Sequence, residues 1–140
     1  MRVLLDANVF VAALLRSKSS RVGSCRTILE AFRDGAFTLI TAKVLVAELS
    51  QVLSRPKFFD LIAPKDVGSL LELIHRDGVF VVPQPSSLAI RDPKDRPVVN
   101  CLYAADVLVT GDHDLQILKR VDKTAIMSPA AFLTWLTTSR

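Results

Sequence analysis

The chain has 140 residues, half of them hydrophobic, and a formal net charge of +4, which suits a single domain over residues 1–140 and weakly favours a polyanionic partner. Its longest apolar runs are far shorter than the ~20 residues of a membrane span, and Asp6 interrupts the apolar start of the chain, unlike a signal peptide. We therefore expect a soluble, cytoplasmic protein with no membrane partner. Cys25 and Cys101 form no Cys-x-x-Cys pattern, so neither a disulfide framework nor a zinc site is predicted.

The first half of the chain predicts two strands, each followed by a helix. Residues 3–5 form an apolar run that suits a strand buried on both faces, ended by Asp6. Helical spacing follows over residues 8–15 and again over 24–33, with a polar, basic break between them. A second strand is expected at 37–40, and Thr41 is placed to cap a helix that runs to about Leu53.

The second half of the chain continues the alternation of strands and helices. We expect a helix at 65–76, a strand at 79–82, a connector at 83–90 and a helix that starts near Asp95 and continues over 98–105. A strand at 107–109, one or two helical turns at 112–119, an edge strand at 125–127 and a closing helix from Ser128-Pro129 to about residue 136 complete the chain. This order predicts an α/β fold: a three-layer α/β/α sandwich with a mostly parallel sheet of four or five strands and helices on both faces.

Carboxylates follow two of the predicted strands at their carboxyl ends. Asp6 ends the first strand, and the strand at 107–109 runs into Thr110-Gly111-Asp112-His113-Asp114. Because the carboxyl ends of parallel strands meet at one edge of the sheet, these acids are expected to lie close together.

Two further acids could join them. Glu48 shares a helical stripe with Val44 and Val52, so its charge calls for a partner. In Asp92-Pro93-Lys94-Asp95, helix capping accounts for one acid and leaves the other unexplained. Taken singly, each acid could equally be a cap or a solvated charge. Together they would repel one another unless a cation balanced them, and an all-carboxylate site suits Mg²⁺ or Mn²⁺. The predicted ligands are Asp6, Glu48, Asp95, Asp112 and Asp114.

In order and approximate spacing, these motifs resemble the PIN-domain family. The match is carried by Leu5-Asp6-Ala7-Asn8-Val9, by Glu48 within its helix, by Asp92-Pro93-x-Asp95 and by Val109-Thr110-Gly111-Asp112-x-Asp114-Leu115. It extends over the whole chain, including Ser128-Pro129-x-x-Phe132-Leu133, and is closest to the prokaryotic branch of toxins from toxin-antitoxin pairs. The segment between Asp95 and Val107 is slightly shorter than is usual in the family.

The resemblance implies a metal-dependent ribonuclease, often a homodimer, with an antitoxin protein as a possible partner. Asp6, Glu48, Asp95 and Asp112 match the family's catalytic acids, with Asp114 as a further metal ligand. Asn8 and Thr110 match polar positions that support the site.

The expected reaction is metal-assisted hydrolysis of an RNA phosphodiester, in which the metal lowers the pKa of a bound water. Basic residues cluster after the first predicted helix and again around Asp92 and Asp95. Those expected to hold RNA phosphates are Arg16, Lys18, Arg21, Arg91 and Arg96. A non-catalytic RNA-binding or protein-interaction module on the same fold is the alternative. DNA cleavage stays open. A phosphotransfer receiver domain fits poorly, because it needs an acidic pair after the first strand, where Ala7 follows Asp6.

Overall fold

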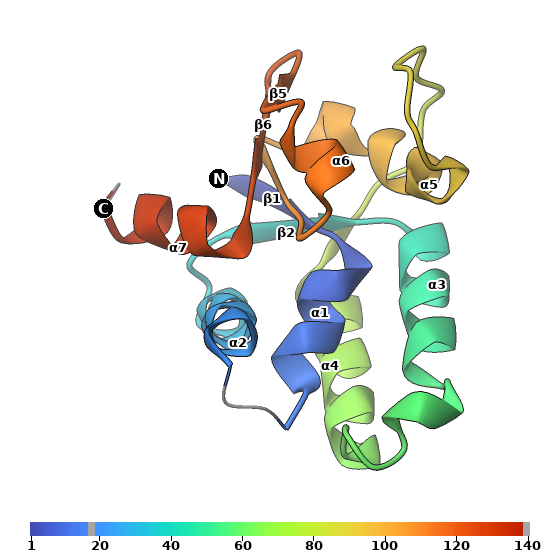
Figure 1. Cartoon of the computed structure of the whole chain (residues 1–140), viewed down its shortest axis with the longest axis vertical. Helices are drawn as coiled ribbons and strands as arrows, with labels where there is room; N and C mark the ends of the chain where they lie inside the picture. The colour runs from blue at the N-terminus through green and yellow to red at the C-terminus, as the bar shows by residue number, and fades with distance from the viewer. Residues whose placement is uncertain (17–18, 139–140) are drawn as a thin grey trace.

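A sheet runs through the middle of the molecule with helices on both of its faces (Figure 1). The computed structural model describes residues 1–16 and 19–138. The strands are β1 (Arg2–Leu5), β2 (Thr38–Thr41), β3 (Val79–Phe80), β4 (Val107–Val109), β5 (Arg120–Val121) and β6 (Thr124–Met127). The α-helices are α1 (Ala7–Leu14), α2 (Ser20–Arg33), α3 (Lys43–Leu53), α4 (Pro64–Asp77), α5 (Arg96–Val99), α6 (His113–Gln116) and α7 (Pro129–Thr138), and the short 3₁₀ helices are η1 (Pro56–Phe58), η2 (Pro93–Asp95) and η3 (Leu102–Ala104).

The strand order places β1 and β4 side by side. In the order β3-β2-β1-β4-β6-β5, every neighbouring pair is parallel except β5 and β6. The chain leaves β1 toward β2 and β3, and later returns to the other side of β1 to form β4. The crevice outside the carboxyl ends of β1 and β4 is therefore the topological switch point, where open α/β sheets bind ligands. The predicted mostly parallel α/β sandwich is confirmed, with six strands in place of four or five.

The two faces of the sheet bury two separate hydrophobic clusters, because side chains alternate along each strand. Val3 and Leu5 pack against α1, α2, α4 and α7, whereas Leu4, between them, packs on the other face with α5 and η3. Figure 1 shows α5 and α6 across the sheet from α1, α2 and α4. Phe132 of α7 is fully buried, with its ring 5.6 Å from that of Phe37. Both faces of the central strands are thus closely packed, which leaves their carboxyl ends as a rigid base for a site.

The chain after β4 differs most from the sequence prediction. β6 was expected to be the edge strand, but it lies between β4 and β5. Lys119 (φ 59°) and Asp122 (φ 52°) turn the backbone through the left-handed region and bring β5 back against β6. Because neither residue is glycine, the sequence carries no clear turn signal there. Of the helical turns predicted at 112–119, α6 covers only His113–Gln116.

The helix predicted over 98–105 is divided into α5 and η3. At the break, the carbonyl of Asn100 accepts a hydrogen bond from the backbone N–H of Gln84 at 2.8 Å, and the N–H of Cys101 donates to Val98 at 3.0 Å. The connector therefore takes a carbonyl that would otherwise continue the helix. This keeps α5 short. Asp95 lies just before the first turn of α5.

Smaller differences occur at three other boundaries. α2 begins at Ser20 instead of residue 24, because the Ser19 hydroxyl caps it by accepting a hydrogen bond from the N–H of Val22 at 3.2 Å. Thr41 does not cap α3; it is the buried last residue of β2, and Ala42 precedes α3 without a side-chain cap. β3 is shorter than predicted.

Within the part of the chain that the structure describes, no helix combines the length and apolar character needed to span a membrane.

Candidate active site

Asp6 is the carboxylate at the end of β1. Its Oδ1 accepts a hydrogen bond from the N–H of Ala7 at 2.8 Å and so caps α1, while its own N–H donates to the carbonyl of Val109 in β4 at 3.0 Å. Burial is the largest influence on the pKa of Asp6 and raises it, and the negative charge of Asp112 adds to the rise. Hydrogen bonds from Thr110 and Ala7 oppose the shift without cancelling it. Asp6 is thus a carboxyl group held in place while partly deprived of solvent.

Thr110 joins Asp6 to Asp112. Its side chain is fully buried, and its hydroxyl donates to Asp6 Oδ2 at 2.8 Å while accepting from the N–H of Asp112 at 3.0 Å. The Thr110 carbonyl accepts from Nε2 of Gln116 at 2.6 Å, so α6 also holds this turn. Gln116 was not identified from the sequence, where an amide two residues after Asp114 gives no distinguishing signal. These bonds set the spacing between the acids that follow β1 and β4.

Removing the Thr110 hydroxyl is expected to destabilise the protein through this pair of bonds. Thr110→Val keeps the side-chain shape but leaves a buried oxygen of Asp6 and the N–H of Asp112 without their partner, which should lower the free energy of unfolding by about 2 kcal/mol. Thr110→Ser keeps the hydroxyl and loses one methyl group, for a cost of about 1 kcal/mol. Urea unfolding of both variants measures the difference. A valine variant as stable as the serine variant would contradict it.

Asp112 and Asp95 approach each other from α6 and α5. Asp112 caps α6 by accepting a hydrogen bond from the N–H of Asp114 at 2.9 Å. Burial, the charge of Asp112 and a hydrogen bond with Asp112 raise the pKa of Asp95 from 3.8 to about 6, with smaller contributions from Asp6 and Asp92. Asp92 is the acid with the capping role, since its Oδ1 accepts from the N–H of Lys94 at 3.0 Å. The short segment before β4 therefore still brings Asp95 to the other acids.

Glu48 faces Asp6 from α3. It is half-buried, and its pKa is raised first by burial and then by the negative charge of Asp6, while the cations Arg55 and Lys94 act in the opposite direction. The sequence analysis gave neither cation a role: Lys94 directly precedes Asp95 in the chain, whereas Arg55 reaches the site only through the fold. Four carboxylates from separate parts of the chain thus influence one another at the switch point. We call Asp6, Glu48, Asp95 and Asp112 the acid cluster.

Two predicted site residues lie apart from the acid cluster. Asp114 pairs with Arg91, with Oδ1 and Nη1 3.4 Å apart, and both side chains are substantially exposed. The backbone N–H of Asp114 donates to the Asp112 carboxylate at 2.9 Å, but within the described residues the Asp114 carboxylate makes no hydrogen bond or ion pair with the acids of the cluster. Asn8 is exposed in the first turn of α1, and its side chain makes no hydrogen bond in that same part of the chain.

The cations proposed to hold RNA also differ in their surroundings. The Arg96 guanidinium donates to the carbonyls of Ser86 at 3.0 Å and Leu88 at 2.9 Å, so it holds the connector in place instead of facing outward. Arg91 is paired with Asp114, and Arg16 is exposed. Lys18 lies outside the described residues. Arg21 packs against the turn at Gly111: a Cβ built on that glycine would stand 3.3 Å from Nη2 of Arg21.

The donor chemistry of the acid cluster fits a hard divalent cation. All four side chains offer oxygen, and a cation between them would offset the repulsion and burial that raise the pKa values of Asp6, Glu48 and Asp95. Within residues 1–16 and 19–138, however, no three acidic, histidine or cysteine side chains already stand close enough together to hold an ion. Loading would therefore require the carboxylates to rotate toward one another.

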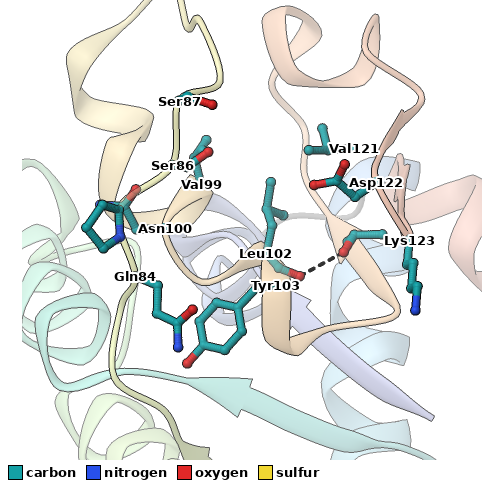
Figure 2. A pocket seen from close by; sticks show the side chains of 12 residues that line it. Gln84, Ser86, Ser87, Val99, Asn100, Leu102, Tyr103, Val121, Asp122 and Lys123 are labelled. Atoms are coloured by element: carbon teal, nitrogen blue, oxygen red, sulfur yellow. Dashed lines mark hydrogen bonds between the residues drawn. The ribbon is translucent and has the colours of Figure 1, made fainter.

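A separate hollow, shown in Figure 2, has no residue of the acid cluster in its lining. It has a volume of about 420 Å³ and is bordered by the connector, by η3 and by the turn between β5 and β6. The Thr124 hydroxyl on its wall donates to the carbonyl of Leu102 at 2.7 Å. Oδ1 of Asn100 has no hydrogen-bond partner among the described residues, but it is shielded from solvent, so a ligand in the hollow would not reach it. None of the predicted site residues lines this hollow.

The fold and the cluster define an α/β domain with an acidic site at the switch point of a parallel sheet. A family model described as PIN domain matches residues 2–114. The chain belongs to the PIN-domain family, which confirms the resemblance found in the sequence and makes this a nuclease fold. Among curated proteins, no significant match to the chain was found.

Proposed function

We propose that the chain is a metal-dependent endoribonuclease that hydrolyses RNA phosphodiester bonds. The observation that carries the proposal is the meeting of Asp6, Glu48, Asp95 and Asp112 at the switch point of a nuclease fold. The net charge of +4 supports a polyanionic substrate. Cations beside the acids, such as Arg21, would supply affinity for phosphates that weakens with salt.

Mg²⁺ or Mn²⁺ would be held by the four carboxylates of the acid cluster. When bound, such an ion lowers the pKa of a water molecule and stabilises negative charge on phosphate oxygens. Thr110 orients the Asp6 carboxylate through its 2.8 Å hydrogen bond, and the N–H of Asp114 in α6 orients the Asp112 carboxylate through a hydrogen bond of 2.9 Å. Asp114 and Asn8 have supporting positions in this proposal: Asp114 orients Arg91, and Asn8 lies exposed beside Asp6.

We further propose the setting that the family resemblance implied. In that setting the chain is the cytoplasmic toxin of a toxin-antitoxin pair, works as a homodimer and is held inactive by its antitoxin. A small DNA-binding protein encoded by the neighbouring reading frame would support this arrangement, and light scattering would measure the number of chains in solution. An isolated gene and a strictly monomeric protein would count against it.

A non-catalytic RNA-binding module is the second candidate. It is favoured by one observation: in the described part of the chain, no three potential ligands are already arranged around an ion. Such a module would bind RNA with or without metal and leave it uncut.

Metal removal tests the two candidates against each other. With Mg²⁺ or Mn²⁺, we expect the protein to cleave single-stranded RNA, and with EDTA we expect cleavage to fall to background. Because binding to the folded state adds stability, Mg²⁺ at about ten times its Kd should raise Tm by roughly 4 °C. DNA of the same sequence, assayed in parallel, shows whether the 2′-hydroxyl is needed. RNA binding without cleavage, together with an unchanged Tm, would support the module and overturn the nuclease.

A further inference from the structure

We propose that Arg21 holds a nucleic-acid phosphate next to the scissile one, in a hollow separated from the acid cluster by the turn at Gly111. The inference rests on the proposed function, because its ligand is the RNA strand that the acid cluster would cut. It adds to that function a defined subsite and a direction in which the strand leaves the acids.

The hollow has a volume of about 430 Å³ and lies between the start of α2, the turn after β4 and the start of α7. The side chains on its wall include a guanidinium, an imidazole and several hydroxyls, and none of them is a carboxylate. Such groups donate hydrogen bonds, and Arg presents a planar fork of donors that matches phosphate oxygens. The polar lining residues are Ser20, Arg21, Ser24, His113, Gln116 and Ser128.

Arg21 is placed directly beside the reaction site by its packing on Gly111. Nη2 would lie only 3.3 Å from a Cβ at that position, so the guanidinium covers the glycine. Gly111 lies in the chain between Thr110 and Asp112, and the N–H of Asp112 donates to the Thr110 hydroxyl at 3.0 Å. A strand with its scissile phosphate at the acid cluster would therefore pass over Gly111 and bring a neighbouring phosphate to Arg21.

Arg21 also differs from Arg26, Arg91 and Arg96 in the partners of its guanidinium group. Arg26 donates to the carbonyls of Ala13 and Leu15, and Arg96 donates to two carbonyls of the connector. Arg91 is paired with Asp114. The side chain of Arg21 has no hydrogen bond or ion pair to any described residue, and it is exposed. Its donors are thus available to a ligand without breaking an internal contact.

RNA binding by a cleavage-deficient protein tests this subsite. In an Asp6→Asn background, the affinity for a fluorescent single-stranded RNA is measured by anisotropy over a series of KCl concentrations, with Arg21→Gln added. We expect Arg21→Gln to weaken binding about five- to tenfold and to reduce the slope of log K against log [KCl] by about 0.7, the value for one phosphate contact on a single strand. Arg21→Lys keeps the charge and should recover part of the affinity.

Arg33→Gln is the matched control. Arg33 is an exposed arginine in the last turn of the same helix, so its replacement removes the same charge away from the hollow. We expect it to change binding less than twofold. If Arg21→Gln and Arg33→Gln bind equally well while the wild-type protein cleaves RNA with Mg²⁺, the subsite is wrong and the proposed function stands. If wild type does not cleave RNA but Arg21→Gln alone weakens binding, the proposed function is overturned, and Arg21 is a phosphate contact of a non-catalytic RNA-binding module instead of a subsite next to a scissile phosphate. If the parent binds no RNA and wild type does not cleave it, both are overturned.

Discussion

Asp6→Asn is expected to lower the rate of metal-dependent RNA cleavage by at least about a hundredfold, because the carboxylate would hold the ion that stabilises transition-state charge. The fold should survive the change. Asparagine is as good a helix cap as aspartate, so the amide oxygen can still accept from the N–H of Ala7. The amide nitrogen can donate to the Thr110 hydroxyl, which has a second lone pair beside the one used by Asp112. The loss of activity would therefore report the lost charge.

Single-turnover cleavage of a labelled RNA measures this effect, and circular dichroism checks the fold. Asp60→Asn is the control: Asp60 is exposed in the loop before α4, and its replacement changes the net charge by the same amount. We expect wild-type cleavage from that variant. An Asp6→Asn protein that cleaves within tenfold of wild type would remove Asp6 from the catalytic acids.

Asp95→Asn is expected to make the metal-free protein more stable at neutral pH while reducing metal-dependent cleavage at least about a hundredfold. Because the pKa of Asp95 is raised from 3.8 to about 6, its charged form is disfavoured in the folded state. An amide carries no charge and can donate a hydrogen bond to Asp112. A full shift of this size would correspond to nearly 3 kcal/mol, and partial exposure of the site reduces the expected gain to about 1 kcal/mol.

The size of this effect changes with pH between the two pKa values of Asp95. Above about pH 6, Asp95 is ionised in both the folded and unfolded states, and the unfavourable contribution to stability is fully present. As the pH falls toward 3.8, the folded state takes up the proton first and the penalty disappears. We therefore expect the stability difference between Asp95→Asn and wild type to be constant above pH 7 and to vanish near pH 4.

Urea unfolding in EDTA over this pH range measures the difference, and a parallel series with Mg²⁺ shows its link to the metal. Mg²⁺ should stabilise wild type and remove most of the advantage of the variant, because the ion compensates the charge that asparagine eliminates. A variant that is less stable than wild type at pH 7.5 in EDTA would contradict the proposed crowding of Asp95. Asp60→Asn, with no such pH dependence, again serves as the control.

The stability and activity predictions for Asp95 point in opposite directions, which is typical of groups kept for function. A site that crowds like charges is unfavourable for folding and is retained because it binds something that balances them. Thr110 behaves differently: its hydrogen bonds to Asp6 and Asp112 support the fold and the arrangement of the acids at once.

The sequence by itself determined the alternation of strands and helices and the acids that follow β1 and β4, because both are local properties. Apolar runs such as residues 3–5 and 107–109 report burial through their own periodicity, and a carboxylate after a strand lies at a predictable edge. The PIN-domain resemblance rested on the same local motifs, and the match over residues 2–114 confirms it. The turns at Lys119 and Asp122 were not predicted, because neither residue type indicates a left-handed backbone conformation.

Only the tertiary structure decided which of the acids meet. Strand order depends on pairing between distant segments, and it is this order that puts β1 beside β4 and brings Asp6 next to Thr110. The same packing separates acids that look equivalent in the sequence, since Asp95 reaches Asp112 while Asp92 caps η2. It also separates Arg96, bound to the connector, from Arg21, which covers Gly111. Side-chain partners across the sheet are set by how the elements pack, and no local spacing encodes them.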